Sequence, residues 1–207
     1  MGKQTQMDLD METIPTFLSG SQPPVSFLGR NGLATLFVVR LFAMIVTAET
    51  IWKDDLHDLF CNSTQVGCRQ ECYNEFSVLT PFIFFALQTI FVTTLLIAVS
   101  CSKNLRQYHN SGQVDSNCLS MLSRVLTEGM FLVLWHAIYP GLSRKSAFKC
   151  DRFPCEPTVV CTMLGNRQKN AFSMFMYMCS LVCILICMIE IFTLAKKRAK
   201  SITKIQV

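Results

Sequence analysis

Six of the eleven cysteines stand in two triplets, spaced as Cys61-x6-Cys68-x3-Cys72 and Cys150-x4-Cys155-x5-Cys161. Each triplet lies in a polar stretch that is flanked by long apolar runs. Because the cytosol keeps thiols reduced, this arrangement predicts two loops outside the cell that are held by disulfides. The spacing alone leaves the pairing of the six cysteines open. The triplets therefore predict a membrane protein whose extracellular loops are clamped by disulfides.

The composition agrees with a membrane location. Hydrophobic residues make up 51% of the 207 residues and charged residues only 16%, whereas soluble domains carry about 25% charged residues. Four apolar segments are long enough to cross roughly 30 Å of hydrocarbon. We place them at residues 33–52, 78–101, 121–142 and 171–195. The first 32 residues contain no apolar core, so we expect the first span to act as its own insertion signal.

The orientation follows from two signals. Lys and Arg number nine in the segments assigned to the cytoplasm and eight in the two cysteine loops, which weakly favours cytoplasmic termini. Disulfide chemistry points the same way. The predicted division has five segments outside the spans: a cytoplasmic N-terminal segment (1–32), a first extracellular loop (53–77), a short cytoplasmic loop (102–120), a second extracellular loop (143–170) and a basic cytoplasmic tail (196–207).

The net charge of +5 does not indicate nucleic-acid binding, because the basic residues are divided between the two faces of the membrane. The tail cluster from Lys196 to Lys200 directly follows a span, and we expect it to meet anionic lipid of the inner leaflet. No glycine-rich phosphate loop, catalytic carboxylate pair in a soluble domain or zinc-ligand spacing supports an enzyme. We therefore expect neither catalysis nor a cofactor.

Polar residues inside the spans are costly, at roughly 2.5–3.5 kcal/mol for a charge at mid-membrane on insertion scales. Arg40 lies in the first span, Gln88 in the second, Arg124 and Glu128 in the third, and Glu190 in the fourth. Arg124 and Glu128 share one helix face and could pair locally. Two interpretations stay open for these residues, namely polar contacts between helices and conduction chemistry.

Both cysteine loops carry specific motifs around their cysteines. The first loop contains Ala48-Glu49-Thr50-Ile51-Trp52-Lys53-Asp54-Asp55, then Cys61-Asn62-Ser63-Thr64-Gln65-Val66-Gly67-Cys68 and Cys72-Tyr73-Asn74. These motifs resemble the first extracellular loop of connexins. The second shares the family's cysteine spacing and the Pro154-Cys155 core. The spans resemble the family through Leu36-Phe37-Val38-Val39-Arg40, Ala86-Leu87-Gln88, Arg124-x3-Glu128, and Ser180 with Glu190. The resemblance covers roughly residues 33–195, and the doubled cysteine motif with Trp52 is its most specific part.

The resemblance implies an all-α fold. It is a four-helix transmembrane bundle with two disulfide-linked extracellular loops, cytoplasmic termini and assembly as a hexamer around a pore. It implies the pairs Cys61–Cys161, Cys68–Cys155 and Cys72–Cys150, and a polar cluster within the subunit formed by Arg40, Gln88, Glu128 and Ser180. The end of the first connexin span lines the outer pore, so Glu49, Asp54 and Asp55 become pore-mouth candidates. Asp55 is also a weak calcium candidate, because Lys53 and Thr50 depart from the family's calcium site.

Other departures concern the contacts between subunits and between hexamers. Lys53 replaces a Gly, Val66 a Pro, and Pro157 a docking Asn of the second loop. Ile83 replaces an Arg that anchors the first loop between neighbouring subunits, and Gln168 replaces its acidic partner. The docking edge keeps Asn62, Gln65 and Thr158. Asn62-Ser63-Thr64 is also the one glycosylation sequon of the chain, and a glycan there would cover that edge unless the loop folds first.

The function that the resemblance implies first is a gap-junction channel passing ions and small molecules between adjacent cells. Its subunits would assemble with copies of themselves or with other connexins into hexamers in the plasma membrane at cell junctions. These hexamers would dock head to head with hexamers of the neighbouring cell. One alternative is an undocked plasma-membrane hemichannel. The other is a non-conducting tetraspan adhesion or structural protein.

Overall fold

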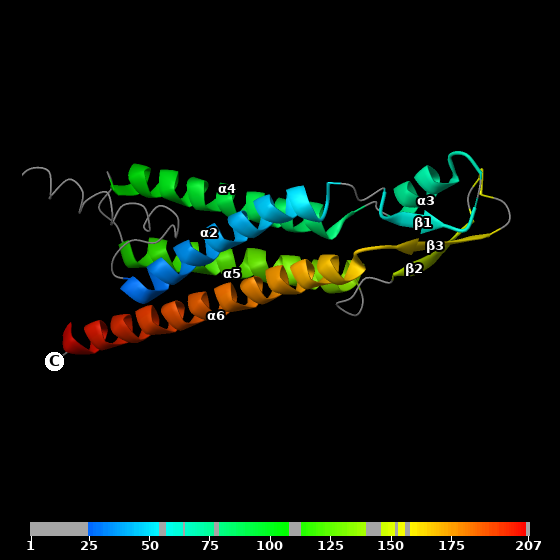
Figure 1. Cartoon of the computed structure of the whole chain (residues 1–207). Helices are drawn as coiled ribbons and strands as arrows, with labels where there is room; N and C mark the ends of the chain where they lie inside the picture. The colour runs from blue at the N-terminus through cyan, green and yellow to red at the C-terminus, as the bar shows by residue number, and fades with distance from the viewer. Residues whose placement is uncertain are drawn as a thin grey trace, which may run out of the picture. The chain divides into compact units, whose positions relative to one another are not determined.

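The structure is a computed structural model, and it describes residues 25–53, 57–63, 65–76, 79–107, 113–139, 146–151, 153–155 and 158–205. Residues 1–24 of the predicted N-terminal segment, the pore-mouth candidates Asp54 and Asp55, and Pro157 lie outside these ranges. Helices dominate the described residues (Figure 1). The long ones are α2 (Phe27–Thr50), α4 (Pro81–Gln107), α5 (Gln113–Ile138) and α6 (Asn166–Ile205), and α3 (Cys68–Phe76) is short.

Each long helix contains a stretch that is apolar and long enough to cross a membrane. The four stretches are Phe27–Thr50, Pro81–Val99, Asn117–Ile138 and Asn166–Lys200. The predicted fold class of four transmembrane helices is therefore confirmed in length and composition. Large apolar side chains such as Leu126, Ile189 and Phe192 are more than 60% exposed within the chain, which suits helices that face lipid.

Two of these helices begin at recognisable caps. Ser26 precedes α2, and its hydroxyl accepts a hydrogen bond from the N–H of Gly29 at 3.0 Å. Thr80 precedes α4 in the same way and accepts from the N–H of Ile83 at 3.3 Å. Hydroxyl residues are favoured at this position because they satisfy a backbone N–H that the helix leaves unpaired. Pro81 then occupies the first helical position, where its missing N–H costs nothing.

The chain divides into two compact units, and each of the four long helices contributes a stretch to both. The first, here called the helical unit, comprises Met1–Leu41, Gln88–Leu132 and Met178–Val207. The second, here called the loop unit, comprises Phe42–Leu87 and Val133–Tyr177. The helical unit packs around an apolar cluster formed by Val25, Leu33, Met121, Cys183, Cys187 and Leu194.

The loop unit contains a three-stranded antiparallel sheet that the cysteine spacing did not predict. Its strands are β1 (Leu59–Cys61), β2 (Ala147–Cys150) and β3 (Val159–Met163), in the order β1-β3-β2. Along β3, Val159, Cys161 and Met163 are buried while the residues between them are exposed, the alternation of a strand with one covered face. Helix α3 lies beside β1 (Figure 1).

Candidate functional sites: the disulfide core and the buried polar cluster

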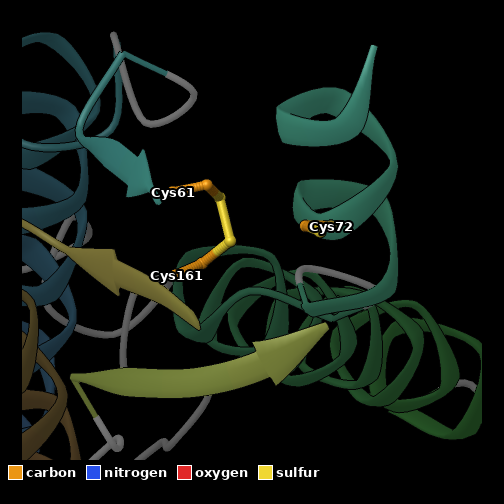
Figure 2. Close-up of side chains that lie close together, drawn as sticks. All are labelled: Cys61, Cys72 and Cys161. Carbon is orange, nitrogen blue, oxygen red and sulfur yellow. A yellow bond between two sulfur atoms is a disulfide. The ribbon is translucent and has the colours of Figure 1, made fainter. Parts of the chain in front are cut away.

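Three disulfides join the first cysteine loop to the second. They are Cys61–Cys161, Cys68–Cys155 and Cys72–Cys150, the same pairs that the resemblance implies. Cys61 and Cys161 face each other directly across β1 and β3, and Figure 2 shows their bond with Cys72 of α3 close by. Cys68 and Cys72 are four residues apart in α3, so one helix face presents both sulfurs to the second loop.

These cystines form most of the buried apolar cluster that joins the two cysteine loops. Cys68, Cys72, Cys150, Cys155 and Cys161 are each at most 1% exposed, and they pack with Leu59, Val159 and Met163. Segments this short bury little apolar surface, so cross-links replace the hydrophobic core that they lack. The sulfurs of Cys61, Cys72 and Cys161 lie within 4.8 Å of one another. All three are oxidised, however, and a disulfide sulfur offers no thiolate to a metal ion.

The three docking-edge candidates are all exposed. Asn62 follows β1, and its backbone N–H donates to the carbonyl of Val160 at 3.1 Å, which leaves the side chain on the surface. The N–H of Gln65 donates to the hydroxyl of Ser63 at 3.2 Å. Val66, which replaces the family's proline, is 97% exposed. The disulfide core therefore presents an edge on which polar side chains and the apolar Val66 are exposed together.

Arg40, Gln88, Glu128 and Ser180 meet in the helical unit, one from each long helix. Arg40 donates to both carboxylate oxygens of Glu128, at 2.5 and 3.1 Å, and to the hydroxyl of Ser180 at 2.5 Å. Gln88 donates to Glu128 at 2.5 Å and to Ser180 at 2.9 Å. The structure thus brings together the four residues that the resemblance groups, and every long helix is tied into one hydrogen-bonded network.

The network is almost fully buried. Arg40 is 5% exposed, Gln88 2%, and Glu128 and Ser180 0%. A charge at such a position is tolerated because an opposite charge pairs with it. The two Nη atoms of Arg40 make these bonds, while its Nε is buried without a hydrogen-bond partner among the described residues. The carboxylate of Glu128 is shared by Arg40 and Gln88, and in the part of the chain that the structure describes it forms no ion pair with Arg124. The partner of Glu128 therefore comes from another helix rather than from the turn before it.

Comparison with known families decides the identity. A family model for connexins matches residues 10–115 and 97–196, which together cover most of the chain. This chain belongs to the connexin family. Connexins are channel proteins rather than enzymes, and they assemble into oligomers that form gap-junction channels. As a connexin, the chain is a multi-pass membrane protein, in agreement with its four apolar helices.

The pore-mouth candidates of this connexin are only partly described. Glu49 is exposed in the last turn of α2, and one of its carboxylate oxygens lies 3.9 Å from Nζ of Lys53. Both side chains are more than 60% exposed, so this contact contributes little to stability. Asp54 and Asp55, including the calcium candidate, lie outside the described residues. Among these candidates, the described Glu49 thus lies beside a basic side chain.

Sequence reasoning missed an ion pair in the loop unit. Lys169 is 1% exposed, and its Nζ lies 3.3 Å from Oδ2 of Asp58 and 5.5 Å from the ring centre of Trp52. Trp52 in turn packs against Phe82 and Phe172. In the sequence, Lys169 is one of the eight basic residues of the two cysteine loops. The signal that could have found it is helical spacing, since Lys169 shares one face of α6 with the buried residues Phe172 and Met176.

A second missed contact ties the start of α2 to α6. Glu190 is 6% exposed, and its carboxylate accepts hydrogen bonds from the backbone N–H of Ser26, at 3.2 Å, and from the Ser26 hydroxyl. A carboxylate is favourable there because the N-terminus of a helix carries partial positive charge. A Cβ atom on Gly29 would collide with this carboxylate. Gly29 is therefore the residue that lets α6 approach the cap of α2.

Proposed function

We propose that six copies of this connexin surround a pore in the plasma membrane, with both cysteine loops outside the cell and both termini in the cytoplasm. Two such hexamers, one from each of two adjacent cells, dock through their loop units. The resulting channel passes ions and small molecules between the cells. The subunits are copies of this chain or of other connexins.

The observation that carries this proposal is the disulfide core. Three cross-links hold the two loops as one body, and Asn62, Gln65 and Thr158 are exposed on it. Head-to-head docking needs a surface that is rigid before contact, because ordering loops during association costs affinity. A cross-linked edge of this kind, with polar side chains and the apolar Val66 exposed on it, supports docking between hexamers.

The decisive experiment records conductance between paired cells that express this connexin alone. We expect a junctional current when both cells express it and none when only one does. The comparison variant is Cys68→Ser with Cys155→Ser, which removes one cross-link of the docking surface without leaving a free thiol and should lower the junctional current. Surface-expressed protein without junctional current in both-expressing pairs would contradict docking.

The undocked hemichannel is the second candidate, and the exposed Asn62 favours it. Asn62 opens the sequon on the same edge that docking would use. If Asn62 carries a glycan, glycosidase treatment will shift the protein on a gel, and Asn62→Gln will abolish that shift. Asn62→Gln should then also create or increase current between paired cells. Dye uptake by single cells without transfer between cells identifies the hemichannel, and neither uptake nor transfer identifies a non-conducting tetraspan protein.

The pore mouth should give the channel a modest preference for cations. Sixfold repetition of Glu49, Asp54 and Asp55 makes an acidic ring, which concentrates cations, while Lys53 opposes it. We expect Asp55→Asn to lower cation-over-anion permeability and to weaken closure by millimolar external calcium, and Lys53→Gln to raise cation preference. Reversal potentials in asymmetric salt test both. No change in either variant would place these residues outside the conduction path, for example in pairs with loop residues such as Lys149.

The basic end of α6 should contact lipid. Lys196, Lys197, Arg198 and Lys200 are exposed in the last described turns of this helix. With the termini in the cytoplasm, this cluster meets the anionic inner leaflet, which attracts each such charge by about 1 kcal/mol.

A further inference from the structure

A small pocket lies between α4 and α5 in the helical unit, and nothing in the proposed channel function uses it. Its space is about the size of one water molecule. The wall from α4 is apolar and the wall from α5 is polar. The lining residues are Val92, Leu95, Leu96 and Val99 of α4, and Ser120, Ser123, Arg124 and Thr127 of α5.

Arg124 brings an unbalanced charge to this pocket. It is 5% exposed, and its Nη2 has no hydrogen-bond partner among the described residues. The nearest carboxylate along its own helix, Glu128, is already bound by Arg40 and Gln88. The other buried carboxylate described in the helical unit, Glu190, is bound by Ser26. A guanidinium so far from water requires a counter-charge, because an isolated buried cation is strongly destabilising.

The polar wall can supply hydrogen-bond donors in addition to the charged guanidinium of Arg124. The Ser123 hydroxyl donates to the carbonyl of Ser120 at 2.9 Å, and the Thr127 hydroxyl donates to the carbonyl of Ser123 at 2.8 Å. Inside a helix these carbonyls also accept backbone N–H groups, so the hydroxyl bonds are dispensable. Either hydroxyl can rotate and donate to an anion instead. The apolar wall of α4 offers no acceptor that competes for Arg124.

We propose that this pocket binds a single small monovalent anion, which is chloride under cellular conditions. The guanidinium of Arg124 supplies the charge, and the Ser123 and Thr127 hydroxyls supply further donors. The size of the pocket excludes a lipid phosphate group. The bound ion neutralises the charge that Arg124 brings to α5 beside α4. The stability of the helical unit therefore depends on chloride.

The test compares thermal unfolding of the full-length purified connexin in chloride, bromide and gluconate at equal ionic strength. We expect the midpoint to be about 3–6 °C higher in either halide than in gluconate, when the halide is at about ten times its Kd. Arg124→Gln should abolish the difference. The exposed Arg167 provides a matched control, and Arg167→Gln should keep it.

Three results would overturn the assignment. Equal midpoints in all three salts would mean that the pocket holds water only. A halide effect that survives Arg124→Gln would place the ion elsewhere. A rise of the unfolding midpoint produced in gluconate by added phosphatidylserine, with none from halide, would identify a lipid site.

If Arg124→Gln does not fold, Thr127→Val replaces it, and an undiminished halide shift in that variant would count against the site. The proposal stands apart from docking, because paired-cell current does not report on it.

Discussion

The loop unit and the helical unit both hold together segments that are far apart in sequence, but they do so with different bonds. The loop unit uses three covalent cross-links between two short loops. The helical unit uses a buried network of four polar side chains, one from each long helix. The loops are too small to bury a large apolar core, so disulfides replace it. The helices lie in lipid, where apolar surface does not drive them together, so packing and interhelical hydrogen bonds must.

The difference predicts how each unit fails. A disulfide constrains the chain whether or not its neighbours are intact, so the loss of one leaves the other two in place. In the polar network every donor and acceptor depends on the others, so the loss of the central cation leaves a buried carboxylate behind. We therefore expect the helical unit to fail abruptly and the loop unit to fail in steps.

The largest expected effect is in the helical unit. Arg40→Leu leaves Glu128 buried without its cation and should destabilise the protein by about 3–5 kcal/mol. The double variant Arg40→Leu with Glu128→Leu removes both charges and should recover much of that loss. Thermal unfolding of the purified protein measures both, with the exposed Arg167→Leu as the control. A double variant no more stable than the single one would show that the pair does not act as a unit.

The next effect is in the loop unit. Cys68→Ser leaves Cys155 with a free thiol and should cost about 2–5 kcal/mol, with misassembly as the visible result. Cys68→Ser with Cys155→Ser should assemble better, because no thiol remains to exchange and Cys72–Cys150 still anchors α3. Peptide mapping without reduction follows the bonds, and Cys118→Ser, which removes a free cysteine, is the control. Free thiols among the six loop cysteines, or disulfides confined to one loop, in the unmodified protein would refute the cross-links between the loops.

A smaller effect separates close approach from ordinary packing. A Cβ on Gly29 would strike the Glu190 carboxylate, whereas a Cβ on Gly32 would meet only Ile186, at 3.6 Å. We expect Gly29→Ala to cost about 1–3 kcal/mol. Gly32→Ala should be neutral or stabilise by up to about 1 kcal/mol, because alanine is the better helix former. Equal unfolding midpoints for the two variants would show that α6 does not hold the start of α2.

The smallest expected effect probes the one ion pair described in the core of the loop unit. Lys169→Met removes the partner of Asp58, but the Asp58 side chain is 39% exposed and can turn to water. We therefore expect a loss of about 1–2 kcal/mol, which includes the contact with Trp52. The exposed Lys149→Met should leave the unfolding midpoint unchanged. A loss for Lys169→Met as large as that for Cys68→Ser would mean that this unit depends on its ion pair as much as on its cross-links.

Much of the candidate site could be predicted because it depends on residue types and on short spacings in the sequence. The two cysteine triplets, the apolar runs and the polar residues within them are read directly from the chain, and the resemblance to connexins then assigns the disulfide pairs. Lys169 and Glu190 were not recognised as contacts. Their partners, Asp58 and Ser26, are more than 100 residues away in sequence, and no local spacing links them.

The sequence by itself determined that this protein spans a membrane, that its two cysteine loops are cross-linked, and that it belongs with the connexins. These features depend on residue types and short spacings, which are local. Only the tertiary structure decided that Lys169 is buried and that Gly29 makes room for Glu190. The resemblance already grouped Arg40 with Glu128, and the tertiary structure decided between that pairing and the local one with Arg124 that the spacing also allowed. Each of these contacts depends on which faces of the helices are turned toward each other, because hydrogen bonds and ion pairs form only between side chains about 3 Å apart. The order of residues along the chain does not state which faces meet.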